Sequence, residues 1–312
     1  MDINKELLFF EPVFKERIWG GKKLRECFNY NIPSDNVGEC WGISAHQNGD
    51  CLIKNGAFKD KSLSYLYKNE KELFGKVKSR VFPLLIKIID TKEDCSIQVH
   101  PNDDYAREHE HGSLGKMECW YILDCEKDST LVVGHKAKTK EELCKLLDEG
   151  NVFDLINEIP VKKGDFVQID PGTIHSIKGG IMVLETQQNS DITYRVCDYD
   201  RLHNGRKRKL HISESKDVIT VPSGNAPVLH FDDVEGSTRM IERSKYIVDK
   251  IVVKDTLDID VTEYFRLFSC IEGKGSVNGI SIYKGDHFMA PANIGKVSFK
   301  GDMVLISSTV NQ

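Results

Sequence analysis

Four side chains that are far apart in the chain could together bind one divalent metal ion. Gln98 and His100 stand two positions apart, Glu118 opens the run ECWYIL, and His175 follows a Pro-Gly-Thr turn. Two imidazoles, a carboxylate and an amide oxygen form a donor set without a thiolate, which suits zinc and other first-row divalent ions. Such a set also leaves a position for water or a substrate. The pattern therefore predicts a single metal centre that is open to a small molecule.

Short strands are the elements that must position these ligands. Side chains of a strand repeat on one face every two residues, so Gln98 and His100 would point the same way. Short β-type runs bounded by Gly, Asp and Pro occupy residues 82–89, 96–100, 119–123 and 130–133. They predict a mainly β sandwich or barrel rather than alternating strands and helices. Helices are expected over residues 61–78 and, after the capping box that begins at Thr139, up to Leu147.

The combination of residues matters more than any single one. A lone buried histidine is usually a satisfied core residue, so His175 by itself would not predict a metal. The Q-x-H pair, the later glutamate and the turn before His175 favour ligation when they occur together. His109 and His111 also have H-x-H spacing, but they lie in the charged segment YAREHEHGS. We expect these two on a loop or a helix surface instead.

A faint internal repeat predicts two related β-barrels. Residues 163–171 (KGDFVQIDP) return as residues 284–291 (KGDHFMAP), and each copy places a Gly-Asp turn before a strand that proline closes. His175 follows the first copy, whereas Gly295 stands at the matching place after the second. We expect residues 1–220 to form the metal-binding domain, with helical insertions, and residues 221–312 to form a barrel without metal ligands.

Composition excludes several classes of function. The chain has 312 residues and a formal net charge of −5, so it does not attract nucleic acid as a whole. The basic run at residues 206–209 (RKRK) is interpreted as solvated surface or local ion pairing. No apolar run reaches the roughly 20 residues that span a bilayer, and the start lacks a signal-peptide pattern. Nine scattered cysteines without a CxxC pair indicate reduced thiols, so we expect a cytoplasmic protein that does not bind membranes.

Several motifs, in order along the chain, resemble one known family. They are RIWGG (17–21), GECWGIS (38–44), SIQVHPND (96–103), GKMECWYIL (115–123), GDFVQIDPGTIHSI (164–177) and ETQQNSDITYRVCDYDR (185–201). Together they resemble the short bacterial form of class I mannose-6-phosphate isomerase, a metal-dependent cupin enzyme. The resemblance covers roughly residues 10–210, and the weaker C-terminal half completes the layout. It implies a mainly β fold of two cupin-type β-barrels (a bicupin), with a few helices in the N-terminal half.

The resemblance also implies a ligand set and a substrate pocket. The zinc ligands of the family correspond to Gln98, His100, Glu118 and His175, with one Zn2+ per chain or another first-row divalent ion in its place. Positions that line the sugar-phosphate pocket of the family correspond to Arg201, Ser96 and Lys87. Lys87 lies within an apolar run, where an ammonium group is expected to be paired or to face a pocket.

The implied reaction interconverts mannose 6-phosphate and fructose 6-phosphate through ring opening and a cis-enediol. Arg195, which matches the arginine of the family's Thr-Tyr-Arg segment, is suited to stabilise the developing negative charge. Glu185 is the favoured base for the proton that moves between C1 and C2. Lys116, two residues before Glu118, is the rival base. No Walker-type phosphate loop is present, so nucleotide use is not expected.

Two other functions remain open on the sequence alone. One is a different enzyme on the same scaffold, such as an iron oxygenase or a cupin that acts on another sugar phosphate. The other is a non-catalytic sugar-phosphate-binding or regulatory module, since a fold does not fix a function. The complete ligand set and the arginines at 195 and 201 favour the isomerase, because binding alone needs no Lewis acid. The expected partner is a small-molecule sugar phosphate, and the oligomeric state is open.

Overall fold

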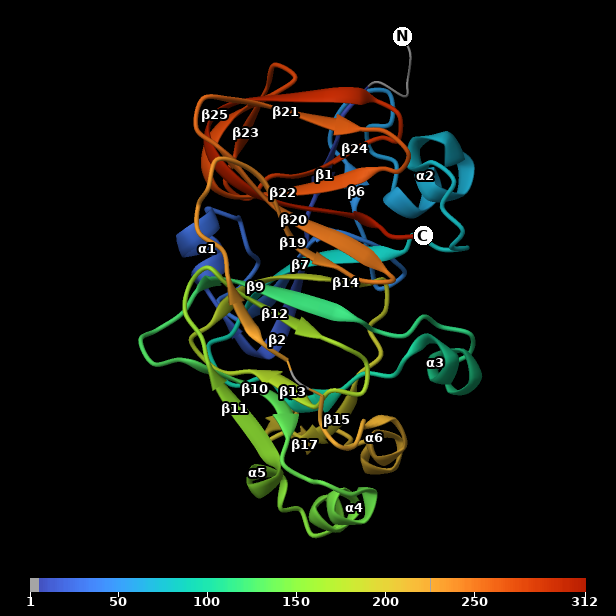
Figure 1. The fold of residues 1–312 in the computed structure, drawn as a ribbon, viewed down its shortest axis with the longest axis vertical. Helices are drawn as coiled ribbons and strands as arrows, with labels where there is room; N and C mark the ends of the chain where they lie inside the picture. The colour runs from blue at the N-terminus through green and yellow to red at the C-terminus, as the bar shows by residue number, and fades with distance from the viewer. Residues whose placement is uncertain (1–5, 225) are drawn as a thin grey trace.

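Strands dominate the structure, a computed structural model that describes residues 6–224 and 226–312 (Figure 1). The helices are α1 (Lys23–Phe28), α2 (Leu63–Asn69), α3 (Asp103–His109), α4 (Lys140–Asp148), α5 (Val152–Leu155), α6 (Ile212–Val218) and a 3-10 helix at Lys71–Phe74. The mainly β fold with a few helices, gathered mostly in the N-terminal half, is therefore confirmed. None of the helices in the described part of the chain has the length and apolar character to span a bilayer.

A seven-stranded antiparallel sheet forms the middle layer of the molecule (Figure 1). Its strands, in spatial order, are β18 (Val228–His230), β12 (Asp165–Ile169), β9 (Glu118–Asp124), β14 (Met182–Gln188), β7 (Leu84–Asp90), β3 (Val37–Ile43) and β2 (Val13–Gly21). The central strands are buried along their whole length or nearly so, which explains their continuous apolar runs.

A five-stranded antiparallel sheet lies below the middle layer in Figure 1, next to α4, α5 and α6. Its order is β11 (Ile156–Pro160), β10 (Thr130–His135), β13 (His175–Ile177), β8 (Ile97–Val99) and β15 (Tyr194–Cys197). Apolar side chains from the two sheets pack together, including Trp120 and Val183 from the middle layer and Leu131 and Ile177 from the five-stranded sheet. The space between these two sheets is where the predicted site residues converge.

A nine-stranded sheet forms the upper layer (Figure 1). Its path is β19 (Gly236–Glu242), β20 (Tyr246–Val253), β25 (Gly295–Val310), β22 (Arg266–Val277), β24 (His287–Ala290), β1 (Leu8–Glu11) and β6 (Leu52–Ile53), with β21 (Thr256–Val261) on β25 and β23 (Ile280–Tyr283) on β22. β1 and β6 come from the start of the chain, so this sheet is not built from C-terminal residues alone. A shared apolar core joins this sheet to the middle layer.

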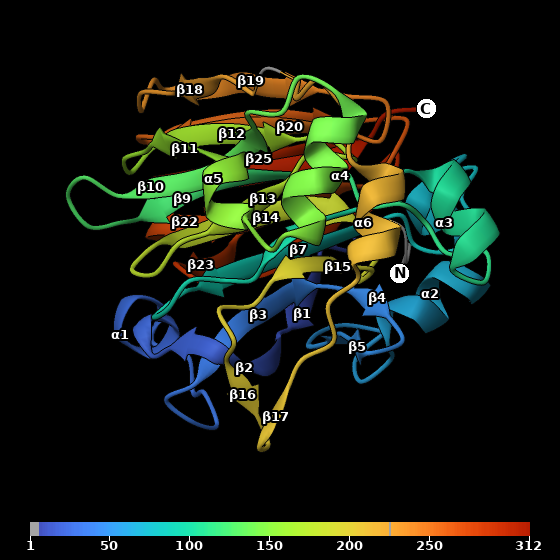
Figure 2. The ribbon, with the colours of Figure 1, turned by 90° about the horizontal axis from the view of Figure 1, so that it is seen from below.

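Two hairpins stand outside the large sheets. They are β4 (Ala45–His46) with β5 (Gly49–Asp50), and β16 (Leu202–His203) with β17 (Arg206–Lys207). The second hairpin projects from the body of the molecule beside β2 and β3 (Figure 2). It includes the first half of the basic run at residues 206–209, which was expected at the surface.

The predicted strands are found with small shifts at their ends, but one helix is shorter than expected. The helical pattern over residues 61–78 gives α2, which ends at Asn69, and a separate 3-10 turn. Glu70 has φ −121° and ψ 57°, outside the helical region, and it breaks the helix although the apolar spacing continues. The capping prediction is correct, because the Thr139 side chain accepts a hydrogen bond from the Glu142 backbone N–H.

The two copies of the internal repeat form matching turns. Gly164 and Gly285 have φ of 89° and 97°, which side chains rarely adopt, and each precedes a strand, β12 and β24 respectively. Gly295 follows the second copy at the place where His175 follows the first. All nine cysteines are free thiols.

Candidate active site

The four predicted metal ligands lie together in the interior. The Nε2 atoms of His100 and His175 are 3.1 Å apart, and the Glu118 carboxylate oxygens lie 3.5 Å and 3.3 Å from them. One donor atom of each of these three buried residues falls within 4.8 Å of the others. Gln98 adjoins the cluster, with its amide Nε2 3.3 Å from His175 Nε2. A half-turn of this amide would present its oxygen to the same cluster.

Two facing sheets supply the ligands. On the five-stranded sheet, β13 pairs with β8 so that His175 lies opposite Gln98, and His100 follows directly after β8. Glu118 is the first residue of β9 in the middle sheet. The ligands therefore converge across the layer between the sheets, which fixes them on rigid elements rather than on a mobile loop.

The two histidines are oriented as metal ligands usually are. Nδ1 of His100 donates to the Ile192 carbonyl at 2.8 Å, and Nδ1 of His175 donates to the Thr173 carbonyl at 2.9 Å. Because each Nδ1 carries the proton, each Nε2 presents a lone pair to the cluster. Burial, followed by the charge of Lys116, lowers the pKa of both rings, that of His175 to about 3, so both are neutral at ordinary pH.

The electrostatics of the cluster fit a cation. Two lone pairs and a carboxylate face one another, and Glu118 Oε1 has no hydrogen-bond partner among the described residues. Lys116 turns its ammonium group into this cluster, with Nζ 3.0 Å from His100 Nε2 and in contact with Glu118 Oε2. Buried acceptors that repel one another are stable only around positive charge. The donor set is therefore suited to a divalent metal ion.

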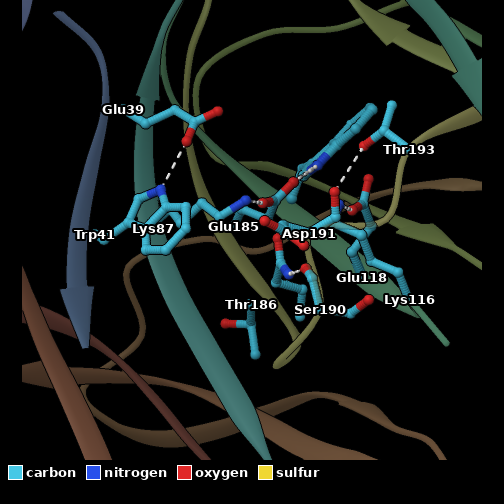
Figure 3. A network of polar contacts seen from close by, with 12 residues as sticks. Glu39, Trp41, Lys87, Lys116, Glu118, Glu185, Thr186, Ser190, Asp191 and Thr193 are labelled. Carbon is cyan, nitrogen blue, oxygen red and sulfur yellow. Dashed lines mark hydrogen bonds and ion pairs between the residues drawn. The ribbon is translucent and has the colours of Figure 1, made fainter. Parts of the chain in front are cut away.

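A row of polar side chains crosses the middle sheet beside the cluster. Trp41, Lys87, Glu185 and Trp120 are register partners on β3, β7, β14 and β9, so they share one face. Lys87 Nζ lies 2.9 Å from Glu185 Oε2 (Figure 3), and Trp120 Nε1 donates to Glu185 Oε1 at 3.0 Å. The prediction that Lys87 is paired inside its apolar run is confirmed.

Glu185 is ionised in this row. Burial alone would raise the pKa of its carboxyl, but the ammonium groups of Lys116 and Lys87 outweigh burial and hold the pKa below its usual range. The charges on either side of it therefore decide the protonation state of the carboxylate that the sequence analysis favoured as base.

Glu39 extends the row at the pocket wall, and its role was not predicted. Arg17 donates to both oxygens of the Glu39 carboxylate, from Nε at 3.0 Å and from Nη2 at 2.9 Å. Trp41 Nε1 also donates to this carboxylate, at 2.6 Å (Figure 3). These residues lie in the motifs RIWGG and GECWGIS, which carried the resemblance without indicating that their side chains meet.

A pocket of about 540 Å³ opens between the two sheets and β2, within the range of small-molecule sites. Gln98, Lys116, Glu185 and Arg195 all line it, so the ligand cluster borders a space that also holds the predicted catalytic side chains. Six cationic and four acidic side chains line the pocket, although the chain as a whole carries a net charge of −5. The pocket is thus a positive region of an acidic protein.

The predicted phosphate residues have different positions. Ser96 and Lys87 line the pocket, whereas Arg201 lies outside its lining. All three guanidinium nitrogens of Arg201 donate to protein oxygens: Nε and Nη2 to Asp198, and Nη1 to the Asp94 carbonyl. Arg201 is therefore not brought to the pocket with the other predicted site residues, because its side chain is used to hold Asp198.

The other histidine pair and the basic run lie away from the ligand cluster, apart from Arg208 at the pocket. His109 ends α3 and His111 lies in the turn that follows, both with exposed side chains, in agreement with the expected loop or helix surface. The basic run forms local ion pairs, as interpreted, but Arg208 also lines the pocket, which the sequence analysis did not predict.

The chain is similar to known families along most of its length. Residues 7–144 match the family described as phosphomannose isomerase type I, catalytic domain, and residues 237–310 match the mannose-6-phosphate isomerase cupin domain. The chain is 46% identical to mannose-6-phosphate isomerase ManA of Bacillus subtilis (strain 168), over 96% of this chain and 97% of that one. It is 44% identical to the mannose-6-phosphate isomerase of Streptococcus mutans, over 98% and 99% of the two chains.

Solved structures show the same fold. The crystal structure of mannose 6-phosphate isomerase from Bacillus subtilis has a TM-score of 0.88 and 42% identity, over 97% of this chain and 99% of that one. A mannose 6-phosphate isomerase bound with zinc and yttrium has a TM-score of 0.79 over 98% and 100% of the chains, and at 15% identity it shows a shared fold only.

Proposed function

The chain belongs to the type I mannose-6-phosphate isomerase family, and from that membership we propose that it interconverts mannose 6-phosphate and fructose 6-phosphate in the pocket between the two sheets. One observation carries the proposal: a single pocket is lined by Gln98 of the ligand cluster, by Lys116, by the ionised Glu185 and by Arg195. A Lewis-acid site, a base and a fixed cation are the groups that an aldose–ketose isomerisation needs in one place.

Gln98, His100, Glu118 and His175 would hold one divalent ion per chain, which we propose to be Zn2+. Their nitrogen and oxygen donors support that choice, and so does the neutral state of both imidazoles. When bound, the ion supplies Lewis-acid stabilisation for negative charge on the neighbouring sugar oxygens. The protein's own contribution is to hold the ligands on two rigid sheets.

Arg195 is proposed to stabilise the charge that develops as the sugar becomes an enediolate. It is the register partner of Gln98 on β15, so its side chain shares the ligand face of the five-stranded sheet. Its buried Nε has no hydrogen-bond partner among the described residues, and its side chain lines the pocket. A guanidinium group stays charged at all working pH values and donates in a planar fork.

Glu185 is proposed as the base that moves the proton between C1 and C2. It is ionised, it lines the pocket, and Lys87 and Trp120 hold both of its oxygens in place. Lys116, beside Glu118, is the second candidate and could serve the sugar oxygens instead. A substrate labelled with deuterium at C2 separates the two residues, because loss of the carbon base abolishes exchange of that label with solvent.

The finer layout of the protein is also a proposal. We propose two cupin-type barrels, a catalytic unit at residues 1–220 and a ligand-free unit at residues 221–312, with β1 and β6 crossing into the second. The matching Gly164 and Gly285 turns support a common origin of the two units. We also propose a cytoplasmic location, which is supported by nine unpaired thiols.

A coupled assay tests the proposed function. The purified chain is given mannose 6-phosphate or, for comparison, glucose 6-phosphate, with chelator and then with added zinc. We expect fructose 6-phosphate from mannose 6-phosphate only, with activity lost on chelation and restored by the metal. Failure of the zinc-loaded chain to form any ketose from mannose 6-phosphate would contradict the proposal.

A further inference from the structure

Two arginines pair with one carboxylate beside the pocket, and a third arginine lies near them. Arg201 and Arg208 both pair with Asp198, whose side chain is only 4% exposed. Arg195 lies close enough that burial, and then the charge of Arg208, lowers its pKa. Two guanidinium groups therefore share one buried counter-ion while a third lies nearby, so the cluster carries excess positive charge. Like charges crowd in this way most readily where an anion completes the set.

The three arginines differ in what they leave free. Arg201 spends every nitrogen on Asp198 and Asp94, so it anchors Asp198 to the segment that leads into β8. Arg208 spends its Nε and Nη2 edge on Asp198, and no described residue accepts a hydrogen bond from its Nη1. Arg208 lines the pocket and Arg201 does not. Arg201 thus fixes Asp198, and Asp198 in turn positions the side chain of Arg208 at the pocket.

Arg195 is joined to the segment that carries Arg208. Its Nη1 donates to the Lys209 carbonyl, the residue after Arg208, at 3.1 Å. Its buried Nε has no acceptor among the described residues. Arg195 and Arg208 both line the pocket, and each is held by hydrogen bonds that exist before any ligand arrives. A site prepared in this way loses little side-chain entropy on binding.

We propose that Arg208, carried just past the β16–β17 hairpin, binds the phosphate group of the sugar phosphate, and that Asp198 and Arg201 position it. This inference rests on the proposed function and assigns a residue that binds the phosphate group of its substrate. A phosphate dianion matches both the excess charge of the cluster and the planar donors of a guanidinium group. The basic run at residues 206–209 thereby gains a role beyond local ion pairing.

Binding of inorganic phosphate is the direct test, because it needs neither turnover nor the metal. The titration compares the parent chain with Arg208→Gln and with Arg206→Gln, a matched control that removes the same charge from the same hairpin outside the pocket lining. Arg208→Gln should weaken phosphate binding about tenfold or more, the loss expected for one charge-assisted hydrogen bond. Arg206→Gln should change it less than about twofold.

Kinetics then separate the effect of Arg208 on substrate binding from any effect on the chemical step. With mannose 6-phosphate, Arg208→Gln should raise KM by the same factor as the phosphate dissociation constant and leave kcat within a few-fold, since the loss is one of uniform binding. Arg208→Lys, which keeps the charge but not the fork, should fall in between and serves if the glutamine variant does not fold. Asp198 keeps Arg201 as a partner in both variants.

Two results would overturn the assignment. Equal phosphate affinities for the Arg208 and Arg206 variants would show that the hairpin contributes only general charge. Unchanged phosphate affinity in Arg208→Gln would show that Arg208 does not bind the phosphate group. If the parent chain binds phosphate through Arg208 but forms no ketose, the proposed reaction is wrong while the assignment of Arg208 to phosphate binding holds. The two failures are therefore distinguishable.

Discussion

Lys87 and Glu185 stand opposite each other on neighbouring strands, and their charged ends meet 2.9 Å apart inside the middle sheet. Their side chains are 7% and 3% exposed, so neither charge is screened by bulk water. Leaving either charge buried alone would cost several kcal/mol. The pair therefore fixes both the position and the ionisation of the carboxylate proposed as base.

Replacing Lys87 with Met should raise the pKa of Glu185, because burial remains while a neighbouring positive charge is lost. A base works only when ionised, so the acidic limb of the kcat/KM profile should move to higher pH. The free energy of unfolding should fall by about 3–5 kcal/mol, as for other broken buried pairs. A pH–rate profile and a denaturant titration measure the two effects.

Lys15→Met is the control for this change. Lys15 lines the same pocket and carries the same charge, but it contacts Trp41 and the Asn48 carbonyl rather than Glu185. Its loss should leave the acidic limb in place. If both variants move the limb equally, the effect comes from the overall field of the pocket and the specific role of Lys87 is lost.

Replacing His175 with Ala should remove the metal and the turnover together. Its Nε2 faces both His100 and Glu118, and the remaining side chains do not supply a substitute imidazole. Metal content per chain, measured after gel filtration, should fall from about one to near zero. His109→Ala, an exposed histidine at the end of α3, should keep full metal content. A His175→Ala protein that retains metal at full stoichiometry would contradict the ligand assignment.

Replacing Arg195 with Gln should lower kcat by roughly 100- to 1000-fold, the range seen when one donor to a developing oxyanion is removed. The metal should stay bound, because Arg195 makes none of the contacts within the His100–Glu118–His175 cluster. Arg195→Lys should recover only part of the rate, since lysine restores charge without the fork. Near-normal kcat in the glutamine variant would end its catalytic role.

His287 predicts how stability responds to acid. It is buried against Gly42, between Tyr30 Oη at 3.0 Å and Ser269 Oγ at 2.8 Å, and burial lowers the pKa of its ring to about 3. In the unfolded chain the pKa is about 6.5, so its contribution to stability is complete above that pH. As the pH falls from about 6.5 towards 3, the unfolded state takes up a proton that the folded state refuses, and stability is lost.

The variant His287→Gln should flatten this dependence by the equivalent of one proton, about 1.4 kcal/mol per pH unit. Denaturant titrations between pH 4 and 7 measure the difference between variant and parent. The same substitution at exposed His109 should leave the slope unchanged. A parallel offset at every pH, without a change in slope, would mean that His287 acts through packing alone.

The sequence predicted that the candidate ligand side chains come together because the signal is local and periodic. Gln98 and His100 carry the two-residue period of a strand, and the turn before His175 has its own composition. Strand pairing then brought His175 opposite Gln98, which no local pattern states but which the family resemblance implied. Lys87 was predictable for a different reason, since a lysine in an apolar run requires a partner.

The pairing of Arg201 and Arg208 with Asp198 was not predictable in the same way. Arg208 belongs to a run that composition reads as surface, and its partner Asp198 lies in a loop without periodicity. Arg201 was assigned to the phosphate by its position in a motif, and only the path of its side chain shows that it holds Asp198 instead. The shortened helix α2 has a related cause, because the backbone of Glu70 overrides a pattern that side chains continue.

The place of β1 in the upper sheet has consequences for how the chain can be cut. The register of this strand joins Leu8 to Met289, so the upper sheet depends on a contact between residues very far apart in the sequence. Contacts this distant in sequence are slow to form and costly to lose. A fragment that begins at residue 221 would expose the hydrogen-bonding edge of β24 that β1 now covers, and an open edge of this kind invites pairing between molecules. Expression of the second unit alone should therefore yield aggregates, and adding the first strand through a linker should restore a monodisperse protein.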